Sequence, residues 1–420
     1  GTYPYVAGAV IVANGEDHLS ALLAASLIHH PRNGPILYTQ QNKLPDITKQ
    51  EIARLAPTGQ ASESQVLLVG GPGVISDAVM NEIKSLGLTV SRIGTDDILD
   101  TAEKVDKFLV YQGYIYHLAL KRDIVIFPIE LREESMIPSS WVAHWDASVL
   151  FTRKDGLPEE TARAIRARST PPDVFIIGGE SVVSSKVESE LRALPIDSLE
   201  RIGGATPAEV AVNFARFKKD DFGWGYTEPG SKAFVLMRAV SKADILSGVA
   251  ASIFGHLGKH SPVLLTEPDG KLGEVTKTYL ETVQPYIPLT PARVEENHGY
   301  VISIADSIPE AVEAQFNDLI VGDNNLAIVS GELVPDTIAA GGTAQLILHA
   351  HNFSVRDRTY VLPLKVNGKT EQFKTVTLAA LPRDLIMTQD DNIVFPITKK
   401  EPGVYYLQAG RFETFLTVTG

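Results

Sequence analysis

Short apolar runs alternate with longer amphipathic stretches along the first three quarters of the chain. Val10–Ala13 contains no polar residue, and the alanine-rich segment Leu19–His30 follows it after a polar loop. Parallel strands that are buried on both faces have such continuous apolar sequences, and helices connect them. The pattern therefore predicts α/β structure with parallel sheets for residues 1–325.

The order of these elements is repeated three times. In each copy one strand ends in threonine, and the first two copies also have a Gly-Gly pair and an Arg-Ile-Gly triplet. The third copy has Ser303-Ile304 where Gly-Gly is expected, so it is degenerate. We therefore expect three repeated modules of roughly 100 residues each, with the boundaries 1–95, 96–204 and 205–325.

The pattern changes near Leu326, where alanine-rich stretches end and short alternating runs begin. The pair Asn367-Gly368 separates two of these runs, and this dipeptide is a strong signal for a tight β-hairpin. About seven short strands separated by turn residues are typical of an immunoglobulin-like sandwich, here without the cysteine pair of antibody domains. We predict an all-β, Ig-like sandwich over residues 326–420.

Composition narrows the class of protein. The chain of 420 residues has no cysteine, which excludes disulfides, thiolate metal sites and a cysteine nucleophile. Its net charge is −13, and residues 326–420 carry nine basic and nine acidic side chains, so the acidic excess lies in residues 1–325. Nucleic-acid binding needs basic surfaces against phosphates, and this distribution argues against it. No apolar run reaches the roughly 18–20 residues of a membrane-spanning helix.

Ordered motifs run through the copies: the threonine-ending strand, a helix that starts with Leu-Pro, Gly-Gly after a strand, and Arg-Ile-Gly near the end. This order resembles the clostridial-type cell-wall-binding repeat family, which occurs as tandem triplets in surface-layer and other wall-attached proteins. The residues that carry the resemblance are Pro35-Ile36-Leu37-Tyr38-Thr39, Leu44-Pro45, Gly70-Gly71, Arg92-Ile93-Gly94, Thr101-Ala102, Gly178-Gly179, Arg201-Ile202-Gly203-Gly204 and Pro262-Val263-Leu264-Leu265-Thr266.

The resemblance implies a compact, pseudo-threefold body of α/β modules, an extracellular location at the cell surface, no catalysis and no cofactor. The implied partners are a cell-wall polysaccharide, anionic in this family, or other surface proteins. In the family an arginine usually follows the Arg-Ile-Gly triplet, but Ile98 and Pro207 occupy that place here. We therefore expect weak affinity for anionic glycans. The segment Leu362–Lys369 resembles adhesion-type Ig-like domains of prokaryotic surface proteins.

Candidate binding residues come from the repeated motifs and from one tryptophan. Trp224 lies in the glycine-rich stretch Asp221–Tyr226, so we expect an exposed ring that can stack on a sugar or contact a partner, whereas Trp141 is expected in the core. The candidates for polymer or partner binding are Pro35, Ile36, Leu37, Thr39, Arg92, Thr152, Arg201, Trp224, Asp244 and Thr266.

Three histidines occupy equivalent positions in the copies, namely His30, His144 and His256. Around a threefold axis their imidazoles can approach one another as metal ligands. The alternative is a histidine in the last turn of a helix, where the helix dipole favours it. Acidic clusters such as Asp96-Asp97-Asp100 are candidates for a structural calcium site. The alternative is that these carboxylates only cap helices. The Gly-Gly pairs read either as phosphate-binding loops or as tight turns.

Three functions remain open from the sequence. The leading one is attachment to a cell wall or assembly within a surface layer by a non-enzymatic protein. The second is a self-assembling scaffold or filament subunit without affinity for polysaccharide, and the third, more remote, is a hydrolase. In either of the first two cases we expect a homo-oligomer or polymer, with Gly1–Tyr5 or the strand Phe412–Val418 packing on a neighbour.

Overall fold

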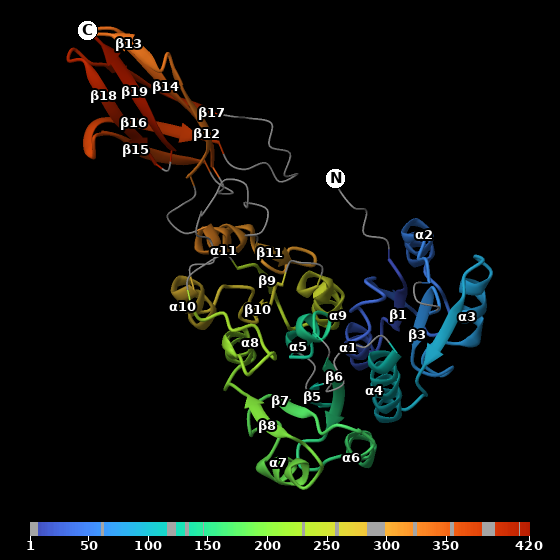
Figure 1. Cartoon of the computed structure of the whole chain (residues 1–420). Helices are drawn as coiled ribbons and strands as arrows, with labels where there is room; N and C mark the ends of the chain where they lie inside the picture. The colour runs from blue at the N-terminus through green and yellow to red at the C-terminus, as the bar shows by residue number, and fades with distance from the viewer. Residues whose placement is uncertain are drawn as a thin grey trace. The chain divides into compact units, whose positions relative to one another are not determined.

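The structure is a computed structural model, which describes residues 7–59, 63–115, 123–130, 134–145, 147–228, 232–256, 260–283, 299–321, 326–352, 357–379, 391–410 and 412–420. These residues form two compact units. The first comprises Gly1–Thr227, Ala233–Tyr279 and Tyr300–Pro309, and the second comprises Glu228–Lys232, Leu280–Gly299 and Glu310–Gly420. Figure 1 shows the α/β modules in blue, green and yellow, and the all-β part in orange and red.

The first module is built on a four-stranded parallel sheet. Its strand order is β2-β1-β3-β4, and every residue of β1 and β3 is buried. Alternate residues enter two separate cores, because Ile11 and Leu67 face one side of the sheet while Val10 and Leu68 face the other. The elements are β1 (Val10–Asn14), α1 (His18–Ala25), β2 (Ile36–Thr39), α2 (Asp46–Leu55), β3 (Val66–Val69), α3 (Asp77–Lys84) and β4 (Val90–Ile93).

The second and third modules repeat this plan. The second sheet has the order β6-β5-β7-β8, and the third has β10-β9-β11. The second module contains α4 (Ile98–Ile115), β5 (Asp123–Pro128), α5 (Met136–Val142), β6 (Ala147–Thr152), α6 (Glu159–Arg166), β7 (Asp173–Ile177), α7 (Ser185–Arg192) and β8 (Ser198–Ile202). The third contains α8 (Pro207–Arg216), β9 (Phe234–Met237), α9 (Lys242–Ala250), the 3₁₀ helix η2 (Ala251–Gly255), β10 (Val263–Leu265), α10 (Glu274–Val283) and β11 (Gly299–Ile302).

The modules of the first unit share one core. Equivalent helices α1, α5 and α9 contact one another pairwise, as a pseudo-threefold arrangement requires. The Tyr38 hydroxyl of the first module donates to the Leu246 carbonyl of the third at 2.6 Å. At Gly255, a Cβ would come within 2.1 Å of the Ser140 carbonyl oxygen of the second module. The predicted fold class of repeated parallel α/β modules is confirmed.

The second unit contains the all-β part and α11 (Glu310–Val321). Two sheets, β12-β14-β17 and β13-β19-β18-β15-β16, enclose an apolar core between them. Asn367 and Gly368 have φ values of 49° and 79°, as the hairpin turn between β15 and β16 requires. The strands are β12 (Leu326–Val334), β13 (Thr337–Ala339), β14 (Thr343–Asn352), β15 (Arg358–Val366), β16 (Lys369–Leu378), β17 (Asp391–Thr398), β18 (Gly403–Ala409) and β19 (Phe412–Thr419).

Two local predictions need correction. The helix predicted to reach His30 ends at Ala25, because the chain continues in tight turns after that residue. In the third module α9 gives way to the 3₁₀ helix η2 after Ala250, so His256 follows a 3₁₀ turn and not the last turn of an α-helix. The module boundaries stay predictions, as does the Ig-like connectivity, and the Gly1–Tyr5 lead lies outside the described residues. Among the residues described, no helix combines the length and apolarity needed to cross a membrane.

Candidate functional site

The threonines that end the equivalent strands are buried and bonded locally. Thr39, Thr152 and Thr266 are 1 %, 0 % and 6 % exposed. Each hydroxyl donates to the carbonyl of the next residue, at distances of 3.0–3.1 Å. These bonds shape the turn that leads to the following helix. In the free chain, these hydroxyls therefore serve the fold of each module.

The two motif arginines are also engaged within their own modules. Arg92 donates from Nη1 to the Gly70 carbonyl at 2.9 Å, and Arg201 does the same to Gly178 at 2.8 Å. Arg92 pairs with Asp77, and Arg201 pairs with Glu188. Each guanidinium thus ties the loop after the third strand to the next helix, and little of its charge is left for an external anion.

The other motif candidates are distributed between core and surface. Ile36 is buried in the sheet, while Pro35 and Leu37 are half-buried. Asp244 is 4 % exposed; it completes the capping box of α9 with Ser241 and pairs with Arg238 at 3.1 Å. The motif candidates are therefore spread over three separate sheets, each embedded in its own local network, and do not gather at one place.

The Gly-Gly and acidic motifs are occupied by the chain itself. Asp96 Oδ1 accepts from the Gly73 amide at 2.6 Å, and a Cβ on Gly71 would come within 2.2 Å of that same oxygen. A carboxylate of the protein therefore fills the position that a bound phosphate would take. Asp97 accepts from the amides of Leu99 and Asp100, so it caps α4. These contacts favour the tight-turn and capping interpretations.

Of the two alternatives for the three equivalent histidines, the structure does not support a shared metal site. His30 is exposed, whereas the adjacent His29 ring lies 5.0 Å from the ring of His256. His144 instead packs against His260, with ring centroids 4.4 Å apart. The offset arises because the chain turns after α1. Within the described part of the chain, no three His, Asp or Glu side chains form a group that can hold a metal ion.

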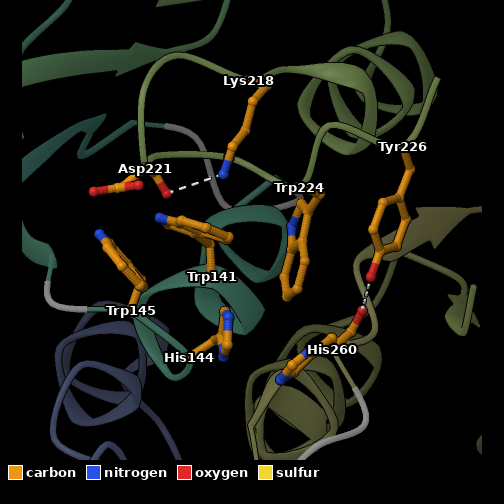
Figure 2. A pocket seen from close by; sticks show the side chains of 9 residues that line it. Trp141, His144, Trp145, Lys218, Asp221, Trp224, Tyr226 and His260 are labelled. Atoms are coloured by element: carbon orange, nitrogen blue, oxygen red, sulfur yellow. Dashed lines mark hydrogen bonds between the residues drawn. The ribbon is translucent and has the colours of Figure 1, made fainter.

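A pocket lies where the end of α5 meets the loop after α8 and His260, which precedes β10. Its cavity volume is about 240 Å³. Figure 2 shows the three indole rings and His144 together, with Lys218 and Asp221 on one side and His260 on the other. The lining residues are Trp141, His144, Trp145, Lys218, Asp221, Gly223, Trp224, Tyr226 and His260.

The rings of this pocket are packed in fixed orientations. Trp224 stacks on His144 with centroids 5.5 Å apart and an interplanar angle of 13°. Trp141 meets Trp224 edge-on with ring centroids 4.9 Å apart. Its centroid lies 6.0 Å from that of Trp145, at an interplanar angle of 31°. The Tyr226 hydroxyl donates to the His260 carbonyl at 2.9 Å, which fixes the far wall.

Burial governs the charge state of the pocket. Burial, and after it the nearby imidazole of His260, lower the pKa of His144 to about 3. Burial also lowers the pKa of His260. Both imidazoles are therefore neutral at pH 7, and each can donate one hydrogen bond and accept another. The Lys218 ammonium donates to the Asp221 carbonyl at 3.2 Å.

Two predicted candidates line this pocket: Trp224, from the binding set, and His144, from the histidines considered as metal ligands. The predicted exposure of Trp224 was wrong. The side chain is 8 % exposed because Gly223 and Gly225, with φ values of 92° and 68°, fold the loop back onto α5. Trp141 is 3 % exposed, as expected of a core residue. The sequence carries a signal for Trp145, as one of only three tryptophans in the chain, but none for Lys218, Tyr226 or His260.

Comparisons with known proteins find a family model that matches the first two modules. A family model described as cell wall binding domain 2 matches residues 3–80 and 92–188. The N-acetylmuramoyl-L-alanine amidase LytC of Bacillus subtilis is 27 % identical over 217 residues, which are 50 % of this chain and 38 % of that protein. The amidase enhancer of Bacillus subtilis is 24 % identical over 359 residues, which are 83 % of this chain and 43 % of that protein. The chain thus spans less than half the length of these relatives.

Among solved structures, Cwp6 from Clostridium difficile has the same fold. Its TM-score is 0.59 at 20 % sequence identity, and the match covers 80 % of this chain and 48 % of Cwp6. The ordered motifs, the family model and the fold agree. Residues 3–80 and 92–188 of the chain belong to the cell wall binding domain 2 family.

Proposed function

We propose that the protein attaches non-covalently to a cell wall at the outer surface of a cell, and that it has no catalytic activity of its own. The observation that carries the proposal is the match of two modules to the cell wall binding domain 2 model. The similarity to the amidase covers 38 % of that enzyme, so its activity does not transfer with the match.

The charge distribution supports a mode of attachment that does not depend on cationic groups. The net charge is −13, and both motif arginines are paired with carboxylates of their own modules. Recognition of phosphate or carboxylate on a polymer needs free Arg or Lys forks. We therefore propose that uncharged parts of the wall glycan supply most of the contacts.

The test is sedimentation of the whole chain with purified Bacillus subtilis cell walls, at low and at high salt. We expect the protein in the pellet at both salt concentrations, with no release of soluble glycan or peptide from the walls. Protein that stays in the supernatant overturns the attachment. Release of wall fragments by the purified protein overturns the proposed lack of catalysis.

A second candidate function is self-assembly, favoured by exposed apolar side chains on the sandwich. Val361, Phe373, Val404 and Phe415 are between 61 % and 71 % exposed. Exposed apolar groups of this size are typical of surfaces that contact another protein. Light scattering of the whole chain tests this function: a concentration-dependent increase in mass supports it, and a monomer at high concentration contradicts it.

A further inference from the structure

All three tryptophans of the 420-residue chain lie around one pocket of the first unit. They reach it from different segments: Trp141 lies in the last turn of α5, Trp145 follows that helix, and Trp224 lies in the loop after α8. Tryptophan is the largest side chain available for stacking, and its concentration at a single cavity is a feature that the fold of the modules does not explain.

Comparison of the three modules shows that the fold does not require a tryptophan at this position. The position of Trp141 is occupied by Leu27 in the first module and by Ile253 in the third. Both equivalents pack against the same core with aliphatic side chains. A buried apolar residue is thus sufficient for the architecture, and the aromatic set occurs at one of the three equivalent positions.

The loop that carries Trp224 is held rigidly. Lys219 and Phe222 pair their amide and carbonyl groups at 2.8 and 2.9 Å, and the Gly225 amide donates to the Phe217 carbonyl at 2.9 Å. A Cβ on Gly223 would come within 2.4 Å of the same carbonyl oxygen. The loop therefore presents its tryptophan in a preformed position, which reduces the entropy lost when a ligand binds.

The polar groups of the pocket are suited to a neutral ligand. Its one ammonium, Lys218, and its one carboxylate, Asp221, cancel in formal charge. His144 and His260 are neutral at pH 7, as burial dictates.

The geometry points to a binding site for an uncharged sugar ring, held by stacking on the indole of the half-buried Trp145 and by hydrogen bonds from its hydroxyls to the imidazoles and the rim. A pyranose has an apolar C–H face and a polar edge, which match the aromatic and polar sides of this pocket. The cavity of about 240 Å³ is smaller than a site for a drug-sized ligand, so it takes a single sugar unit. This inference rests on the proposed wall attachment, and it names the class of ligand.

Two ionic ligands fit the pocket less well. A phosphate group needs convergent Arg or Lys donors, and the pocket has one lysine, already bonded to a carbonyl. A quaternary ammonium ion favours a cage of aromatic faces, but here the faces of Trp141 and Trp224 are perpendicular at 81° and a lysine ammonium lines the same space. Both ions serve as negative probes.

The test uses the intrinsic fluorescence of the whole chain, because every tryptophan that contributes to it lines the pocket. The probes are N-acetylglucosamine, glucose and cellobiose, with inorganic phosphate and tetramethylammonium chloride as ionic controls. We expect saturable quenching or a spectral shift with at least one sugar, at a Kd on the order of 1 mM, and none with either ion. No response to any sugar, or a saturable response to an ion alone, overturns the inference.

Variants test whether the ring faces bind the sugar. Trp145 is half-buried at the edge of the cluster, so Trp145→Ala leaves Trp141 and Trp224 as reporters. We expect at least about a tenfold loss of sugar affinity by calorimetry, because stacking on a ring contributes roughly that much, while Trp145→Phe retains most of it. The matched control is Phe217→Leu, a partly buried aromatic of the same loop that does not line the pocket. Equal losses for both positions contradict a pocket-specific role.

The outcomes separate this inference from the proposed function. Wall sedimentation without sugar binding overturns the pocket and leaves the attachment intact. Sugar binding without wall sedimentation supports the pocket and overturns the attachment. If Trp145→Ala fails to fold, Trp145→Phe and the titration of the unmodified chain still decide the question.

Discussion

The motif residues and the pocket residues of the first unit have opposite distributions. Thr39, Thr152 and Thr266 recur in all copies, and each makes the same local hydrogen bond. The tryptophans of the pocket occur once and satisfy no repeated contact. The comparison teaches that residues shared by the copies can be explained by the fold alone, whereas residues confined to one module need another reason.

The repeated contacts extend beyond the predicted motifs. Thr48, Thr161 and Thr276 donate to the carbonyls of Tyr38, Phe151 and Leu265 at 2.6, 2.5 and 3.0 Å. In each module this bond anchors a helix to a strand end. A threonine at the same position of each module thus makes the same helix-to-strand hydrogen bond, so its recurrence is explained by the fold.

The largest expected effect tests whether the modules fold as one body. Gly255→Val places side-chain atoms where the Ser140 carbonyl of the second module lies. We expect a loss of about 3 kcal/mol or more in the free energy of unfolding, because helices α5 and η2 must separate. Urea denaturation measures it.

The matched control for this substitution is Gly156→Ala. A Cβ at Gly156 meets nothing within 4 Å, so its stability should change little. Equal stability of the Gly255 and Gly156 variants would show that the contact between the modules is not needed for folding.

The next effect tests the repeated threonines. Thr161→Val removes the hydroxyl and leaves the Phe151 carbonyl without that donor in a fully buried place. We expect a loss of about 1–3 kcal/mol in the free energy of unfolding. Thr377→Val, in an exposed hydroxyl pair with Thr359, is the control and should cost less than about 0.5 kcal/mol. If both variants lose the same amount, the repeated bond has no special structural role.

The smallest effect is a pH dependence that arises at the histidines. Burial lowers the folded-state pKa of His144 to about 3 and that of His256 to about 4. The unfolded chain, with ordinary pKa values near 6.5, therefore binds more protons between about pH 4 and 6.5, and stability falls as the pH falls through this range. Solvent screening of these partly exposed rings limits the slope to about 1 kcal/mol per pH unit.

Thermal unfolding as a function of pH measures this slope. His144→Gln should flatten it, because glutamine cannot be protonated in this range. Thr377→Val, which removes no titratable group, should leave the slope unchanged. A slope that is identical in both variants and in the unmodified chain contradicts the assignment to His144.

Much of the fold could be predicted from the sequence, because continuous apolar runs report strands buried on both faces. The strands near Val10, Val66 and Asp173 follow directly from such runs. The strand Asp123–Pro128 contains such a run, Ile124–Phe127, and is missing from the predicted elements. The ends of helices were less predictable, because turns after α1 and the 3₁₀ segment η2 depend on contacts between modules.

The candidate site was less predictable than the fold. Periodicity reports which residues face a sheet or a core, but not which modules meet. The pocket joins Trp145, Lys218 and His260, and the packing of α5 against both α8 and η2 brings these segments together. The burial of Trp224 was also not predictable from periodicity. It depends on the two positive-φ glycines of its loop, which allow the loop to fold inward.

The most direct measurement compares two variants in one assay: sedimentation of Arg201→Met and Trp145→Ala with purified cell walls, each at a temperature where circular dichroism shows it folded. The account predicts that Arg201→Met, which loses a bond to the Gly178 carbonyl, keeps its wall affinity although it unfolds more easily. It predicts that Trp145→Ala loses at least about tenfold in affinity. Retained binding by Trp145→Ala together with lost binding by Arg201→Met would contradict the account.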